Sequence, residues 1–225
     1  MSRVYIPANS PEQWAQFLAE PVKHWRSGYS ARTLAYSWQE ANGFPSEVQR
    51  VLANRAEFAH LDMLLALPEH QVPLPGGSRP SQNDIWVLAR NEAGLVSIAV
   101  EGKVNEPFGP TIGEWVAEGS SGKEARLSFL CDELGICSPP SSALRYQLFH
   151  RTASAVIEAK RFCAPTAVML VHSFSQAHMW FDDFRAFAEA LGCDAAVNTL
   201  SHVGQRSGVD LFIGWVCGDE RYLSK

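Results

Sequence analysis

Residues 84–104 of this 225-residue chain read DIWVLARNEAGLVSIAVEGKV and hold two short apolar runs joined by a turn. The four residues 91–94 (NEAG) between the runs are typical of a β-hairpin loop. Val96, Ile98 and Val100 alternate with less apolar neighbours, which is the pattern of a strand with one face in a core. The stretch therefore predicts two antiparallel strands, over 84–90 and 95–104.

The length of the loop sets the register of this hairpin. If Arg90 pairs with Leu95, as a two-residue or a four-residue loop requires, Asp84 falls opposite Glu101. A three-residue loop would move Asp84 to the other face unless a bulge corrected the register. Directly opposed side chains have Cβ atoms about 4.5–5.5 Å apart. Lys103 shares the face of Glu101, so the hairpin brings two carboxylates and a lysine together.

Two carboxylates this close repel each other and favour a bound cation. Oxygen ligands suit Mg²⁺, with Mn²⁺ as its substitute. We expect Asp84, Glu101 and the backbone carbonyl of Gly102 to be metal ligands. Lys103 would orient or deprotonate a water, or stabilise developing negative charge, which is chemistry for hydrolysing a phosphodiester. The alternative is a charge pair on an exposed sheet face, but Trp86 on that face indicates partial cover.

The rest of the chain predicts one α/β domain over 1–225, with an N-terminal helical part over 1–56 and a core over 57–225. Helices are expected at about 11–20, 21–25, 30–41, 45–55, 111–117, 122–134, 141–162 and 180–191. Further strands are expected at 62–67, 167–172 and 209–216. A loop rich in proline and glycine covers 73–80.

Asp84, sixteen further residues and then Glu101-Gly-Lys103 on a hairpin resemble the PD-(D/E)XK restriction-endonuclease-like superfamily. Residues 81–84 (SQND) stand where that superfamily has Pro-Asp, and the proline is absent. The expected order of elements is similar to its αβββαβ core, a mixed sheet flanked by helices, here with an N-terminal helical extension. Residues 101–109 and 145–162 also resemble an uncharacterised bacterial family of this superfamily, over most of the chain.

The resemblance implies supporting residues. A polar residue on the long helix helps the active site in this superfamily, which indicates Gln147 as catalytic. Some members add an acidic ligand from an early helix, which indicates Glu40, although a solvated helix-end carboxylate is the simpler interpretation. Glu106 would extend the acidic cluster or cap the turn before Pro107.

Three residues of the long helix are candidates for binding substrate phosphates: Arg145, His150 and Arg151. With Lys160 and Arg161 the arginines would form a local basic surface, although helical geometry spreads them over more than one face. The alternative for Arg151 is a purely structural charge pair with Glu158 on an outer helix face.

The amino-acid composition limits the kinds of binding partner and the cellular location that can be expected. The chain has 19 Lys and Arg against 24 Asp and Glu, a net charge of −5, so a globally basic nucleic-acid coat is excluded. Five scattered cysteines and the absence of an apolar leader in residues 1–14 predict a cytoplasmic protein with free thiols, not bound to a membrane. A monomer and a homodimer both stay open.

The sequence thus predicts a magnesium-dependent nuclease or phosphodiesterase, with DNA as the favoured substrate. The alternatives are a binding or regulatory protein that keeps the nuclease fold without cleavage, and a small-molecule phosphoester hydrolase with the same metal pair. No phosphate-binding GxxxxGK[ST] loop, GxGxxG motif or GxSxG nucleophile elbow is present in the sequence.

Overall fold

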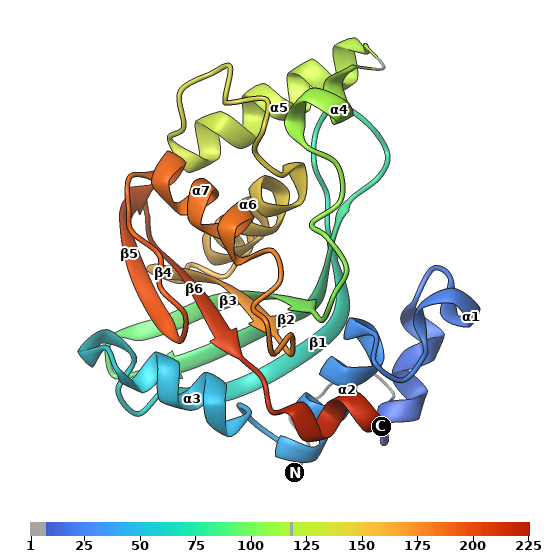
Figure 1. Ribbon diagram of the computed structural model, residues 1–225. Helices are drawn as coiled ribbons and strands as arrows, with labels where there is room; N and C mark the ends of the chain where they lie inside the picture. The colour runs from blue at the N-terminus through green and yellow to red at the C-terminus, as the bar shows by residue number, and fades with distance from the viewer. Residues whose placement is uncertain (1–7, 118) are drawn as a thin grey trace.

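A six-stranded mixed sheet is the centre of the molecule (Figure 1). The computed structural model describes residues 8–117 and 119–225. Its strands are β1 (Asp62–Val72), β2 (Ser81–Asn91), β3 (Gly94–Lys103), β4 (Thr166–Ser173), β5 (Thr199–Arg206) and β6 (Val209–Cys217). Their order in the sheet is β1-β2-β3-β4-β6-β5. The first three strands form an antiparallel meander, β4 and β6 continue it in parallel, and β5 is an antiparallel edge.

Helices cover both faces of the sheet, which confirms the predicted mixed α/β architecture (Figure 1). One face is covered by α4 (Ile112–Val116), α5 (Ser121–Leu134), α6 (Tyr146–Arg161) and α7 (Phe181–Leu191). The other face is covered by η1 (Pro11–Phe17), α2 (Ser30–Ala41), α3 (Ser46–Ala53), η2 (Ala56–Phe58) and η3 (Glu220–Ser224). The short α1 (Pro21–His24) buries none of its residues.

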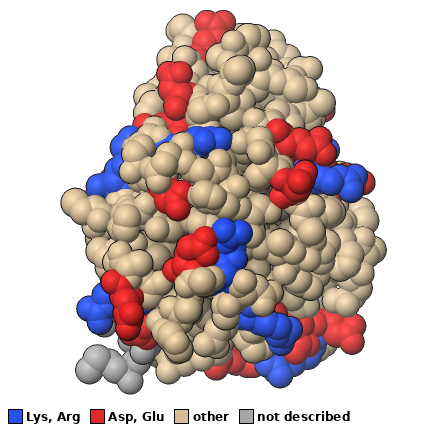
Figure 2. Space-filling model, turned by 90° about the vertical axis from the view of Figure 1, so that its left-hand side faces the viewer, with Lys and Arg blue, Asp and Glu red and all other residues tan. Residues whose placement is uncertain are grey.

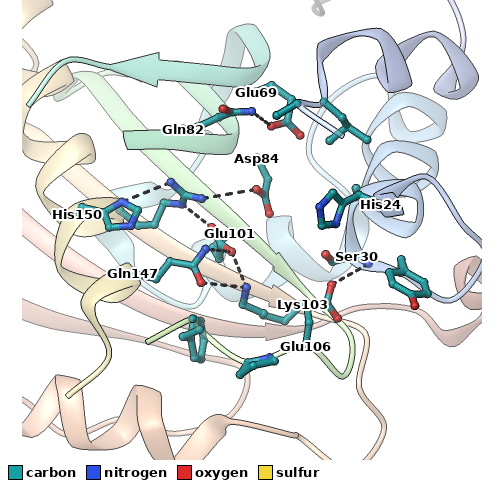
Figure 3. Close-up of a pocket in the computed structure, with 18 of the residues that line it drawn as sticks. His24, Ser30, Glu69, Gln82, Asp84, Glu101, Lys103, Glu106, Gln147 and His150 are labelled. Carbon is teal, nitrogen blue, oxygen red and sulfur yellow. Dashed lines mark hydrogen bonds and ion pairs between the residues drawn. The ribbon is translucent and has the colours of Figure 1, made fainter. Parts of the chain in front are cut away.

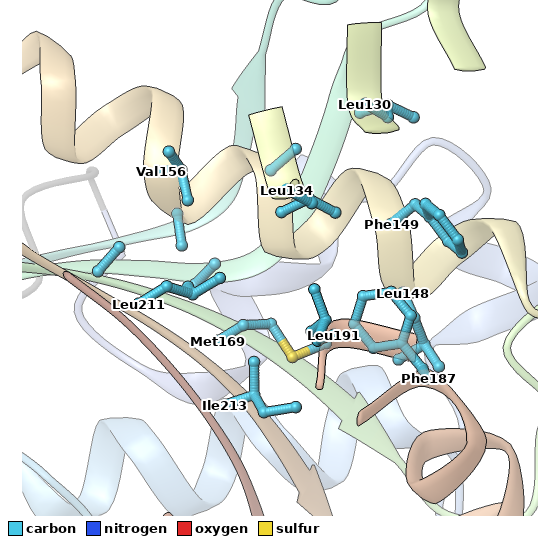
Figure 4. Close-up of a cluster of buried hydrophobic side chains, with 14 of the residues drawn as sticks. Leu130, Leu134, Leu148, Phe149, Val156, Met169, Phe187, Leu191, Leu211 and Ile213 are labelled. Carbon is cyan, nitrogen blue, oxygen red and sulfur yellow. The ribbon is translucent and has the colours of Figure 1, made fainter. Parts of the chain in front are cut away.

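Burial of apolar surface on both faces explains why the central strands are almost wholly apolar. In β4, Ala167, Val168, Met169, Leu170 and Val171 are all fully buried, as expected of a parallel strand covered on both faces. Figure 4 shows Met169 and its sheet neighbours packed against α5, α6 and α7.

A buried polar contact fixes α6 on the sheet. The Ser97 hydroxyl on β3 donates to the Ala155 carbonyl of α6 at 2.9 Å and accepts from Trp86 Nε1 at 2.9 Å. A displaced helix would leave these buried polar groups unpaired. This contact therefore helps to hold the α6 side chains in place over the ends of β2 and β3.

The predicted hairpin register is confirmed. Asn91 pairs with Gly94 around a two-residue turn, and the ladder continues in the same register to Ile85 opposite Val100. A one-residue slip would have turned every side chain of the strand to the other face. Asp84 therefore follows the last ladder pair, next to Glu101.

Several elements differ from the prediction. β5 was not expected, because its residues are polar and Gly204 lies at a register irregularity beside the sheet edge. β1 continues to Val72 because its later residues still pair with β2. The first predicted helix is a 3₁₀ helix, and Ser10 makes no capping hydrogen bond there. α6 begins at Tyr146, since Arg145 bridges to Thr111 instead.

Candidate active site

Asp84 lies where β2 and β3 stop pairing. Its Oδ2 accepts the backbone N–H of Gly102 at 2.7 Å, so the carboxylate itself closes the end of the ladder. A Cβ at Gly102 would lie 3.3 Å from this oxygen and 3.1 Å from Leu34 Cδ2. The glycine between Glu101 and Lys103 thus leaves room for Asp84 and for the packing of α2 beneath it.

Glu101 is the centre of a buried network that joins β3 to α6 (Figure 3). Its Oε1 accepts from Lys103 Nζ at 2.6 Å and from Gln147 Nε2 at 2.8 Å. Its Oε2 accepts from Arg151 Nε at 2.5 Å. Lys103 also donates to Gln147 Oε1 at 3.2 Å. Glu101 and Lys103 are only 2% and 3% exposed, so these are desolvated, charge-assisted bonds.

Glu69 is a third carboxylate at the site, and it was not predicted from the sequence. Gln82 Nε2 donates to its Oε2 at 2.6 Å, and both side chains line the same cavity as Asp84. Glu69 has a left-handed φ of 53°, which is uncommon for a residue other than glycine, and β1 keeps its register with β2 on either side of it. The strand predicted at 62–67 ends before Glu69, so the sequence did not indicate that this residue lies on the sheet.

The carboxylates differ in protonation. Burial and the nearby charges of Glu101 and Glu69 raise the pKa of Asp84 well above its usual value. Burial raises the pKa of Glu69 to about 7, although the Gln82 hydrogen bond acts the other way. Burial also acts to raise the pKa of Glu101, but Arg151 and Lys103 outweigh it and the net shift is downward. Asp84 and Glu69 are therefore stabilised in the neutral form, whereas Arg151 and Lys103 stabilise the charged form of Glu101.

These side chains line a cavity of about 570 Å³. The N-terminal helical part forms one wall, through Leu18, His24 and Ser30 (Figure 3). Glu106 joins this wall to the sheet: its Oε1 accepts from the N–H of Ser30 at 3.0 Å, and its Oε2 caps the turn after β3. Glu106 thus takes the capping role that was one of its two expected roles.

Arg151 and His150 lie at the cavity, but neither presents a free charge to it. Arg151 is bound to Glu101, and its Nη2 lies 4.0 Å from Asp84 Oδ1. This contact replaces the predicted alternative of an Arg151–Glu158 pair. Burial lowers the pKa of His150 well below its usual value, and Arg151 acts in the same direction. His150 is therefore neutral, and Ser81 Oγ lies 2.8 Å from its Nδ1.

Two predicted site residues lie elsewhere. Glu40 is 3.7 Å from Lys225 beside a separate cavity, so the structure does not support it as a ligand of this site. Arg145 is paired with Asp183 at 2.9 Å and donates to the Gly109 carbonyl. Its charge is therefore already compensated.

The expected basic surface on α6 is also not formed. Lys160 pairs with Glu133 at 2.8 Å and Arg161 with the buried Glu158 at 3.0 Å. Because each cation faces a carboxylate, α6 offers no run of uncompensated positive charge. Figure 2 likewise shows acidic and basic side chains interspersed on the face beside β5.

The carboxylate oxygens of the site are the type of ligand that a hard divalent cation prefers. Asp84 Oδ1 accepts no hydrogen bond from the described residues, and mutual repulsion among three carboxylates is what a cation relieves. Both oxygens of Glu101 are already bound by protein donors. Over residues 8–117 and 119–225, no three His, Cys, Asp or Glu side chains are grouped closely enough to hold a metal as they stand. Glu101 would have to leave Arg151 or Lys103 to become a ligand.

The fold and site define a mixed α/β protein with a buried carboxylate–lysine–arginine centre in a cavity. The chain belongs to the family described as Domain of unknown function (DUF6946), whose model matches residues 7–220. No curated protein and no solved structure matches the chain. Within the described part of the chain, every helix is too short or too polar to cross a membrane.

Proposed function

We propose that this protein is a metal-dependent phosphodiester hydrolase of the nuclease type, with DNA as its favoured substrate. One observation carries the proposal: Asp84, Glu101, Lys103 and Gln147, from two strands and a helix, meet in one cavity. A scaffold has no need for clustered buried carboxylates, since each costs free energy when desolvated.

The order of elements supports a restriction-endonuclease-like core. An N-terminal helix, α2, precedes the antiparallel β1–β2–β3 meander, and α6 then connects it to the parallel strand β4. In such a core the acidic residues come from the second and third strands of the meander, where Asp84 and Glu101 lie. Five free cysteines also favour a reducing, cytoplasmic location.

The roles of the side chains follow from their contacts. Asp84 and Glu101 would hold Mg²⁺, which supplies Lewis-acid activation of a phosphate and of a water. Lys103 Nζ, fixed by Glu101 and Gln147, has a third N–H with which to orient the attacking water or to stabilise negative charge on the phosphate. The Gln147 amide holds both partners of this ion pair, so it is a positioning residue.

Calorimetric titration of Mn²⁺ tests the proposal without a guess about the substrate. We expect binding by the wild type, none by Asp84→Asn/Glu101→Gln, and unchanged binding by the control Glu40→Gln, whose carboxylate lies outside the site. A screen of plasmid DNA, single-stranded DNA, RNA and nucleotides with Mg²⁺ then identifies the substrate. Equal heats in the wild type and the double variant would contradict the metal site.

A catalytically silent nuclease-fold binding protein is the second candidate. It is favoured by one observation, the saturation of both Glu101 oxygens by Arg151, Lys103 and Gln147. In that case the network is a structural ion-pair cluster, and the wild type binds no Mn²⁺ and cleaves none of the screened substrates.

A further inference from the structure

A second cavity, of about 560 Å³, lies beside the candidate active site. Pro110 lines both cavities. Tyr146 of the first cavity stacks on Trp115 of the second, with ring centroids 3.9 Å apart and ring planes 10° from parallel. The two cavities are therefore separated by little more than this aromatic pair and a proline.

Arg126 is the feature of the second cavity that indicates a ligand. Its side chain is buried, with the residue only 7% exposed, and it lines the cavity. Its Nε donates to the Pro75 carbonyl at 2.7 Å and its Nη2 to the Gly77 carbonyl at 3.1 Å. No carboxylate of the part of the chain that the structure describes lies within ion-pair distance of this guanidinium. A buried charge is costly unless an opposite charge compensates it, and backbone carbonyls carry no net charge.

The cavity is lined by further charged side chains of both signs. Arg79 is exposed at the rim, and Lys123 lines the wall with its Nζ 2.7 Å from the Trp115 carbonyl. One carboxylate, Glu114, also lines the cavity, and its Oε2 accepts from the N–H of Thr111 at 2.8 Å. Arg126 and Arg79 together outweigh this one carboxylate, which gives the cavity a local attraction for anions.

Close backbone packing between the β1–β2 loop and α5 fixes the shape of the second cavity. The loop between β1 and β2 rises to the start of α5 in Figure 1, and Gly76 meets Gly122 there. A Cβ on Gly76 would lie 2.0 Å from the Gly122 carbonyl oxygen, so glycine is required for the contact. At the same place Ser120 accepts the N–H of Lys123 and caps the 14-residue α5. The Arg126 hydrogen bonds then fix the loop, which gives a preformed pocket.

We propose that this second cavity binds a phosphoryl group, and that in the proposed reaction it holds a phosphate of the substrate strand adjacent to the one that is cleaved. The assignment to a strand rests on the proposed function, whereas the binding of a phosphoryl anion does not. Arg126 supplies a guanidinium that backbone carbonyls hold in place, and Arg79 adds positive charge at the rim. Pro110 and the Trp115–Tyr146 pair form the wall between the two cavities.

The test uses the full chain carrying Asp84→Asn/Glu101→Gln, in EDTA, so that neither metal nor cleavage contributes. The probes are inorganic phosphate, followed by backbone amide NMR shifts, and a fluorescein-labelled single-stranded oligonucleotide, followed by anisotropy. We expect phosphate to shift the amides of Gly77 and Lys123. We expect Arg126→Gln to weaken the binding of both probes by about 10-fold or more, because the substitution removes a hydrogen bond to a charged group. Arg50→Gln, an exposed arginine of α3 on the opposite face of the sheet, is the matched control.

Because Arg126 also holds the loop, Arg79→Gln provides a second test without a buried change, with an expected weakening of about 2- to 5-fold. Equal affinities of the Arg126, Arg79 and Arg50 variants for both probes would overturn the inference. Arg126-dependent phosphate binding without tighter oligonucleotide binding would support the anion site and overturn its link to a strand. A wild-type protein that binds phosphate but no Mn²⁺ would instead contradict the proposed function and leave the anion site supported.

Discussion

At the scale of single residues, the protonation of Glu69 links the site to stability. Its pKa is about 7 in the folded chain, above the ordinary value of 4.5, chiefly because it is buried. A raised pKa stabilises the folded state below the unfolded pKa, and this contribution is lost as the pH rises through about 7. Glu69→Gln keeps the neutral form at every pH. We therefore expect it to raise the free energy of unfolding by about 1–3 kcal/mol at high pH and to change it little near the unfolded pKa.

Urea unfolding of the wild type and Glu69→Gln at about pH 5 and about pH 9 measures this difference. Glu92→Gln, an exposed loop substitution, is the control and should change neither value by more than about 0.5 kcal/mol. A Glu69→Gln effect that is the same at both pH values would show that the folded chain does not perturb this carboxyl.

Lys103 allows binding to be separated from turnover. Lys103→Met keeps a similar shape but removes the ammonium group that Glu101 and Gln147 hold. Since Asp84 and Glu101 would remain to bind the cation, Mn²⁺ binding should be retained. Cleavage should fall by about 10²–10⁴-fold, the usual contribution of a positioned proton donor or acceptor. Retained cleavage with Mg²⁺ would remove Lys103 from the proposed mechanism.

The sequence predicted the identity of the central residues better than their contacts. Asp84, Glu101 and Lys103 meet as expected, because strand alternation is a short-range rule, and Gln147 joins them as the resemblance implied. The use of Arg151 as a partner of Glu101 was not predicted, because it depends on the depth at which α6 packs. For the same reason, sequence spacing could not show that Glu40 lies at a different cavity.

At the scale of the elements, Gly102 controls how closely the end of β3 approaches Asp84 and α2. A Cβ there would come within 3.1 Å of Leu34 Cδ2 and 3.3 Å of Asp84 Oδ2, so one of the two must move. We expect Gly102→Ala to cost about 1–3 kcal/mol of stability through overpacking. A displaced Asp84 should also weaken Mn²⁺ binding by about 10-fold, since a ligand would leave its position.

Gly43→Ala is the matched control for this substitution, because the nearest atom to its added Cβ is 3.8 Å away. Its free energy of unfolding, measured by chemical unfolding, and its Mn²⁺ affinity, measured by calorimetry, should equal those of the wild type. Gly102→Ala with wild-type stability and affinity would mean that neither neighbour is constrained at this position.

Elements with regular alternation were predictable, and irregular ones were not. The β2–β3 hairpin followed from its loop, and its register confirms that a two-residue turn and a buried face are sufficient to set pairing. β1 has a register shift between Met63 and Leu65, and β5 has one between His202 and Gly204. Both irregularities break the period of two on which a prediction from pattern depends.

At the scale of the whole molecule, the N-terminal helical part and the sheet share one core. Leu34 and Trp38 of α2 are buried in the same cluster as Ile85 of β2 and Val168 of β4. Trp38 Nε1 also donates to Nδ1 of the buried His172 on β4 at 3.1 Å. Residues of both parts also line the cavity of the candidate active site. A chain divided at residue 56 would therefore expose apolar surface on each side.

This organisation predicts that the chain unfolds in one cooperative transition. In urea, tryptophan fluorescence and far-ultraviolet circular dichroism should give coincident curves, because Trp38 reports one face of the sheet and Trp215 the other. Mn²⁺ at about 100 times its Kd should shift the whole curve by about 2.7 kcal/mol in the wild type and leave Asp84→Asn/Glu101→Gln unchanged, since a ligand that binds only the folded state stabilises all of it. Two separated transitions would contradict the single-domain prediction. A shift confined to one of them would assign the metal site to that part of the chain alone.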